Sequence, residues 1–218
     1  MSSKSHFFRG GLNIIARYDF NNNLIDSVGG NNGIGSNISY QNNELVFNRP
    51  INPSVLINNL GAFDFTDGIN DLPFKIETSI ILNSLPSNDA NPSNYIIGKR
   101  DNTSTLQNYQ FLVRENGFDF GLLSTNPTGV IGVNNRFSQN LSLNISYDIT
   151  ITYDGSKTKE GLKMVVNGIE QVGNIDNLNY TGQELTGSDV YLGIAGFALS
   201  TNRFYLDAKM DYLKIYKW

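Results

Sequence analysis

Three consecutive antiparallel strands are predicted by the stretch ITITYDGSKTKEGLKMVVNGIEQ, residues Ile149–Gln171. In its first part, isoleucines and a tyrosine alternate with threonines, so one face is apolar and the other is polar. The second part places Leu162, Met164 and Val166 on one face in the same way. The Asn-Gly pair at 167–168 follows directly, and both residues tolerate the positive φ that a type I′ hairpin turn requires. The stretch therefore predicts a meander of antiparallel strands.

The same alternation recurs in short segments along the rest of the chain. The clearest are residues 13–20, 74–82, 108–114 with 118–123, and 203–216. No helical period longer than one or two turns interrupts them. Many short strands separated by polar turns are typical of a sandwich. We therefore expect an all-β fold, an antiparallel two-sheet β-sandwich of jelly-roll topology, with residues 1–12 as a tail and residues 13–218 as one domain.

Composition excludes several kinds of chemistry. The 218 residues carry a net charge of −4, which argues against nucleic acid as a partner. There is no cysteine, and the one histidine, His6, lies in the tail, so neither a Ser-His-Asp triad nor a histidine zinc site can form inside the domain. No apolar run approaches the roughly 20 residues of a spanning helix, so we expect no membrane insertion. The N-terminus lacks the apolar core of a secretory signal.

Three segments resemble the laminin-G-like and pentraxin-like branch of the concanavalin A-like jelly rolls. The meander shows Tyr-Asp-Gly followed by Val-Asn-Gly, and the C-terminal segment DAKMDYLKIYKW, Asp207–Trp218, is similar to the closing strand of those domains. The segment ARYDFNNNLIDSVGGNNG is similar to their first strand and its Asp-containing loop. The resemblance covers about residues 13 to 218 and implies a sandwich whose first and last strands are neighbours. That fold hosts lectins, adhesion modules, glycosidases and structural domains, so it leaves function open.

A calcium site is one expectation that the resemblance implies, because many relatives hold Ca²⁺ with Asp and Asn side chains and loop carbonyls. Asp19, Asp26 and Asn31 lie in the first strand and its loop, and Asp64 with Asp67 offers a second cluster. The alternative is that these residues only form turns.

Asp211 is the fourth candidate calcium ligand. Period-two alternation puts its carboxylate on the face of Leu213 and Ile215, which is the predicted core face. A carboxylate there requires a partner. Arg17 on the neighbouring first strand is the alternative partner to a metal ion.

The tail carries Phe7, Phe8 and Arg9 before a Gly-Gly pair. Two adjacent aromatic residues have no place in a sandwich core, whereas Gly-Gly lets the segment leave the surface. We expect these three residues to contact another subunit of an assembly. The alternative is a frayed end without function.

Three function classes follow. The first is a non-catalytic structural or adhesion module on a bacteriophage virion surface, as a decoration, fibre or tail protein, with a glycan as a further ligand. The second is a free lectin located outside the cell or on its surface, using tyrosines such as Tyr95, Tyr109, Tyr180 and Tyr205. The third is a glycosidase, which needs two facing carboxyl groups; the Glu-x-Asp-x-Glu run that concanavalin-like glycosidases use is absent. We therefore expect no enzymatic activity.

Overall fold

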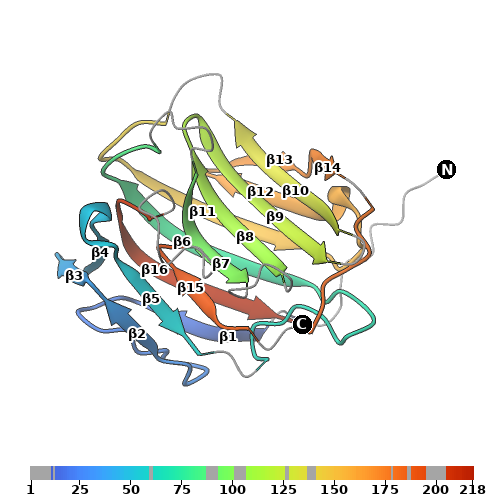
Figure 1. The fold of residues 1–218 in the computed structure, drawn as a ribbon, viewed down its shortest axis with the longest axis horizontal. Helices are drawn as coiled ribbons and strands as arrows, with labels where there is room; N and C mark the ends of the chain where they lie inside the picture. Colours follow the sequence, from blue (N-terminus) through green and yellow to red (C-terminus); the bar gives the residue numbers. More distant parts are fainter. Residues whose placement is uncertain are drawn as a thin grey trace.

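Two antiparallel sheets pack face to face in the computed structural model (Figure 1). The structure describes residues 11, 13–58, 61–86, 93–100, 107–125, 128–136, 141–177, 179–185, 188–194 and 205–218. The predicted β-sandwich is therefore confirmed, whereas Phe7, Phe8 and Arg9 lie outside the described residues. No helix in the described part of the chain is long and apolar enough to cross a membrane.

Sheet I contains the strands at both ends of the described chain. Its order is β13 (Ile169–Val172), β12 (Leu162–Val166), β11 (Ser146–Tyr153), β6 (Phe74–Leu82), β16 (Ala208–Lys217), β4 (Glu44–Phe47) and β3 (Ile38–Gln41). Strand β1 (Asn13–Tyr18) also pairs with β16, so the first and last strands are neighbours as expected.

Sheet II lies over sheet I and is nearest the viewer in Figure 1. Its order is β14 (Ile175–Asn177), β10 (Thr128–Arg136), β9 (Gly117–Thr125), β8 (Gln107–Arg114), β7 (Asn94–Arg100), β15 (Val190–Leu192), β5 (Ser54–Ile57) and β2 (Gly33–Ser36). Two short 3-10 helices, η1 (Arg49–Ile51) and η2 (Lys159–Gly161), connect strands.

The predicted meander is present as β11, β12 and β13. Asn167 and Gly168 both have positive φ, 48° and 82°, which is the turn that joins two strands with their natural twist. The apolar faces of β11 and β12 are buried against sheet II. The sequence pattern therefore set both the strand pairing and the buried face of this region.

Aromatic side chains fill the space between the sheets. Phe65 stacks on Phe74 at 4.1 Å and on Tyr109 at 5.1 Å between ring centres. Phe111 and Phe120 from the neighbouring strands of sheet II extend this cluster. Such rings bury large apolar areas and stabilise the contact between the sheets. The inward faces of β8 and β9 are consequently committed to the core, and only their outward faces can carry a binding site.

The expectation that Asp211 faces the core is wrong. The register of β16 against β6 shifts between Met210 and Tyr212, so Asp211 is the extra residue of a β-bulge. Met210 and Leu213 are buried on either side of it, whereas Asp211 is exposed. A bulge inserts one residue and so reverses the alternation beyond it. Asp211 therefore needs no buried partner, and Arg17 pairs with Asp19 instead, at 2.9 Å.

Candidate binding site on the outer face of sheet II

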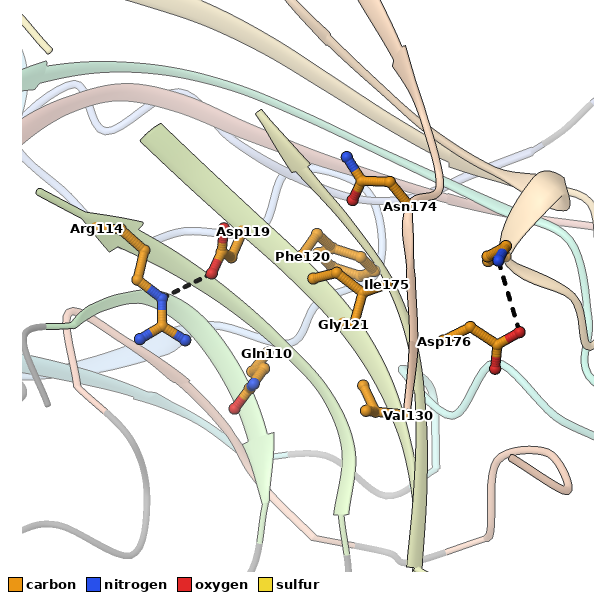
Figure 2. Close-up of a pocket in the computed structure, with 10 residues that line it drawn as sticks. Gln110, Arg114, Asp119, Phe120, Gly121, Val130, Asn174, Ile175 and Asp176 are labelled. Atoms are coloured by element: carbon orange, nitrogen blue, oxygen red, sulfur yellow. Dashed lines mark hydrogen bonds and ion pairs between the residues drawn. The ribbon is translucent and has the colours of Figure 1, made fainter. Parts of the chain in front are cut away.

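A hollow of about 470 Å³ opens on the outer face of sheet II, over β8, β9, β10 and the edge strand β14. Figure 2 shows Arg114 and Asp119 on one side, Asn174 and Asp176 on the other, and Gly121 between them. The lining residues are Gln110, Arg114, Asp119, Phe120, Gly121, Val130, Lys159, Asn174, Ile175 and Asp176.

Gly121 lines this hollow and pairs with a second glycine, Gly132. Gln110 pairs with Gly121, Gly121 with Gly132 and Gly132 with Ile175, so one row across four strands has no side chain at its two middle positions. A Cβ on Gly121 would lie 3.4 Å from the nearest atom, a methyl of Val130, whereas a Cβ on Gly132 would lie 2.8 Å from a backbone carbonyl oxygen. Gly132 is thus required by backbone packing, whereas a Cβ at Gly121 would make only ordinary van der Waals contacts with Val130 and Gln110.

Asp119 is the most unusual side chain in the hollow. Phe118 and Phe120 point into the core, so Asp119 between them points outward, yet it is only 5% exposed. Arg114 donates from Nε to Oδ2 at 2.6 Å. The other oxygen, Oδ1, is buried and has no hydrogen-bond partner within the described parts of the chain. A buried acceptor without a donor is costly, so a ligand hydroxyl or N–H placed there would be stabilised.

The opposite side of the hollow is polar and more open. Lys159, from η2, approaches Asp176 at 3.8 Å, and both side chains are substantially exposed. An exposed ion pair of this kind contributes at most about 1 kcal/mol to stability. The two cations and two carboxylates that line the hollow balance one another. The site therefore does not select an ion by net charge.

Gln110 and Tyr95 connect the hollow to the neighbouring strand. The Tyr95 hydroxyl donates to Gln110 Oε1 at 3.1 Å, and Tyr95 itself is buried. This hydrogen bond fixes the orientation of the Gln110 amide. Together with Asn174 it gives the hollow two carboxamides, and Val130 and Ile175 add apolar surface. Fixed amides, a carboxylate and a small apolar patch suit a ligand that carries several hydroxyl groups.

Asp26 and Asn31, two of the predicted calcium ligands, lie together but are already hydrogen-bonded. Asp26 Oδ1 accepts the backbone N–H groups of Arg17, Val28 and Gly29, at 2.9 to 3.0 Å. Its Oδ2 accepts the Asn31 backbone N–H at 3.1 Å and the Asn31 amide at 3.4 Å. Burial raises the pKa of Asp26, but these N–H donors outweigh burial and hold its pKa below the ordinary value. The carboxylate closes the loop between β1 and β2.

The other candidate ligands do not join this pair in a common site. Asp19 pairs with Arg17, and Asp211 is exposed on its bulge. Asp64 pairs with Lys99 at 3.0 Å inside the sandwich, and Asp67 accepts two backbone N–H groups of its own turn. Among the described residues there is no group of three acidic or histidine side chains with the spacing of a metal site. Calcium binding therefore stays a prediction from sequence.

Sequence analysis did not identify Arg114, Asp119 or Gly121. Arg114 and Asp119 flank the Glu-Asn-Gly turn between β8 and β9, where an Arg and an Asp on the outer face can meet. A glycine inside a strand is a second signal, since it often marks a close approach of another group. Of the tyrosines considered for sugar binding, Tyr95 only supports Gln110. Tyr109, Tyr180 and Tyr205 do not line the hollow.

No family model and no curated protein sequence matches the chain. Solved structures do match. The receptor-binding domain of botulinum neurotoxin type G has a TM-score of 0.60 at 18% identity over 94% of this chain and 47% of its own. The binding domain of Paraclostridial Mosquitocidal Protein 1 has 0.69 at 16%, over 94% and 49%. The binding domain of botulinum neurotoxin serotype D has 0.64 at 15%, over 93% and 47%.

This chain spans about half the length of those structures. At this level of identity the likeness is one of fold. It shows a jelly-roll-like β-sandwich and supports the predicted laminin-G-like resemblance at the level of architecture only.

Proposed function

We propose that the protein is a non-catalytic carbohydrate-binding module, and that a sugar occupies the hollow on the outer face of sheet II. The observation that carries the proposal is Asp119 Oδ1, a buried carboxylate oxygen without a donor among the described residues, in a side chain that lines the hollow together with Gly121. A sugar hydroxyl supplies that donor. Gln110 and Asn174 offer further hydrogen-bonding groups, and Val130 with Ile175 can contact a sugar ring.

The structural neighbours support a binding role, since their names describe receptor-binding and binding domains. A glycosidase is the less favoured reading. It needs two carboxyl groups that face the sugar bond, one acting as general acid. The two carboxylates of the hollow, Asp119 and Asp176, are each engaged with a cation, Arg114 and Lys159.

We further propose that the module belongs to a larger assembly. From the sequence, we place the module on the surface of a bacteriophage virion, with Phe7, Phe8 and Arg9 of the tail contacting another subunit. Deleting residues 2–11 should leave the melting temperature unchanged and abolish incorporation into particles. Normal incorporation of the truncated chain would show that the tail is inert. A free lectin, the alternative, would be recovered outside particles and would still bind glycans.

Sugar binding is tested with a glycan array followed by calorimetric titration of the best glycan. Gly121→Leu should abolish binding because its side chain occupies part of the hollow, and Asp119→Asn should weaken it because Oδ1 is lost as a second acceptor. Asp19→Asn is the matched control, because Asp19 also pairs with an arginine, Arg17 of β1 in sheet I, at 2.9 Å, and does not line the hollow. It should bind as the unmodified protein does.

Two results would contradict the proposal. One is the absence of any glycan ligand on the array; the other is a glycan whose affinity is unchanged in Gly121→Leu. Release of reducing sugar from that glycan would overturn the non-catalytic part. Circular dichroism of each variant, compared with the unmodified protein, establishes that the sandwich is intact.

A further inference from the structure

Lys99 is a buried amine at the inner face of β7. It is 0% exposed, its Nζ lies 3.0 Å from Asp64 Oδ1, and it donates to the carbonyl oxygen of Ser188 at 2.6 Å. Loss of solvation lowers the pKa of Lys99, although Asp64 opposes the shift. A lysine buried in this way is costly for a purely structural role, because a well-packed apolar residue can be equally stable.

A carboxamide reaches the same carboxylate oxygen. Between β7 and β8, Lys99 pairs with Tyr109 and Arg100 with Gln107, so Asn108 is the extra residue of a bulge. The bulge turns Asn108 inward, and it is 0% exposed. Its Nδ2 lies 3.4 Å from Asp64 Oδ1 and donates to the Glu184 carbonyl at 2.7 Å. Asn108 Oδ1 has no hydrogen-bond partner among the residues that the structure describes.

The surroundings exclude water. The Tyr109 ring packs on Phe65 at 5.1 Å, and the Tyr109 hydroxyl is buried without a partner in the described chain. In such a site burial favours the neutral form of the Lys99 amine. A neutral amine is a nucleophile, and a neighbouring carboxyl group can carry its proton. Lys99, Asp64 and Asn108 therefore bring together a nucleophile, a proton carrier and an amide.

We propose that Lys99 and Asn108 form an intramolecular amide cross-link, from Nζ to Cγ, with Asp64 carrying the protons and ammonia leaving. Lys99 first transfers a proton to Asp64, which gives a neutral amine and a carboxylic acid. Nζ attacks Asn108 Cγ while Asp64 protonates Oδ1. The tetrahedral intermediate then collapses, the bond from Cγ to Nδ2 breaks, and Nδ2 leaves as ammonia after taking a proton that Asp64 relays from Nζ. As the carbonyl re-forms, the proton on Oδ1 returns to Asp64, which ends protonated and hydrogen-bonded to the new amide.

The cross-link has a physical advantage in this place. It converts a buried ammonium and a buried carboxylate into neutral groups, which removes their desolvation cost. It also satisfies Asn108 Oδ1, because the protonated Asp64 can donate to the new carbonyl. The bond joins β7 to β8 across a bulge, where the hydrogen-bond ladder is interrupted.

Intact mass spectrometry of the full chain under denaturing conditions tests the proposal directly. The unmodified protein should be lighter than its sequence by one ammonia, and a peptide map should join the peptides of Lys99 and Asn108. Lys99→Arg and Asp64→Ala should each restore the full mass. Lys163→Arg is the matched control, because Lys163 is an exposed lysine that pairs with Glu170 at 3.1 Å, and this variant should keep the loss.

Three outcomes overturn the proposal. A mass equal to that of the sequence, in fresh protein and after long incubation, shows that no bond forms. A loss of one water instead of ammonia shows a bond to Asp64. A loss of ammonia that persists in Lys99→Arg belongs to another site, such as a succinimide at the Asn-Gly pair 167–168. The first measurement uses unmodified protein, so a misfolded variant cannot obscure it.

Discussion

Asp26 and Asp119 are both buried carboxylates, 4% and 5% exposed, but they differ in how many of their oxygens accept hydrogen bonds. Both oxygens of Asp26 accept N–H donors from its own loop and from β1. Asp119 lines the hollow and uses one oxygen for Arg114, and its other oxygen is buried with no donor in the described chain. A carboxylate whose two oxygens are both hydrogen-bonded within the protein has only a structural role, whereas one with an oxygen that lacks a donor can still bind a ligand. Burial alone therefore does not mark a functional residue.

The largest difference should appear in stability. Asp26→Ala leaves four backbone N–H groups without their acceptor, and each unmet donor costs about 1–3 kcal/mol unless water reaches it. We expect the free energy of unfolding to fall by roughly 3 kcal/mol, measured by urea denaturation. Asp119→Ala should cost about 1 kcal/mol, since it removes one hydrogen bond and one unsatisfied atom. Equal losses of unfolding free energy in the two variants would show that hydrogen bonding does not distinguish the two carboxylates.

For glycan affinity we expect the opposite order, with a larger effect of substituting Asp119 than of substituting Asp26. With a glycan identified on the array, Asp119→Asn should weaken affinity at least tenfold, about 1.4 kcal/mol, because the amide offers a donor where the ligand donates. Asp26→Asn should leave the dissociation constant unchanged at a temperature where both variants are folded. Titration calorimetry measures both values. A loss of affinity in Asp26→Asn alone would locate the ligand at the β1–β2 loop.

The pH dependence of stability should follow Asp26. Its pKa is lower in the folded protein than in the unfolded chain, so its contribution is complete above the unfolded pKa of about 4 and is lost as pH falls through the folded value. Stability of the unmodified protein should therefore decline more steeply below about pH 4 than that of Asp26→Asn. Urea titrations at several acidic pH values give both curves. Parallel curves would show that the loop does not hold Asp26 as described.

The smallest effect concerns calcium. A cation at the Asp26 loop would have to replace N–H donors that already fill both oxygens, so we expect the melting temperature to be the same in millimolar calcium and in excess chelator. Asp26→Asn serves as the matched variant. A calcium-dependent rise that disappears in that variant would establish the sequence-based calcium site and reverse this view of the loop.

Local patterns predicted most of the architecture. Alternation along β6, β11 and β12, and the Asn-Gly turn at 167–168, gave the strands and their buried faces, because side-chain direction in a strand depends only on position along the chain. The same rule failed at Asp211, where one inserted residue reverses the alternation. A bulge depends on the pairing with the partner strand, so it cannot be predicted from the sequence of β16 alone.

The candidate site could not be predicted in the same way. Gly121 and Gly132 are eleven residues apart in the chain and become neighbours in one row only because β9 and β10 pair in that register. The tyrosines considered for sugar binding were chosen by residue type, but Tyr95 donates to Gln110, Tyr180 donates to Asp71 and the Tyr109 hydroxyl is buried. Residue type identified groups able to bind a sugar but did not show which ones stay accessible.

The sequence by itself determined the class of fold, the meander, the neighbouring first and last strands and the exclusion of histidine and cysteine chemistry. The class of fold, the meander and the excluded chemistry follow from composition and from periods within single segments, whereas the neighbouring first and last strands were implied by the resemblance to laminin-G-like domains. Only the tertiary structure decided that both oxygens of Asp26 accept hydrogen bonds and that one oxygen of Asp119 has no donor in the described chain. It also decided that Lys99, Asp64 and Asn108 meet inside the sandwich. Those are relations between distant segments, and the free energy of a buried polar group depends on which partners the fold brings within hydrogen-bond distance.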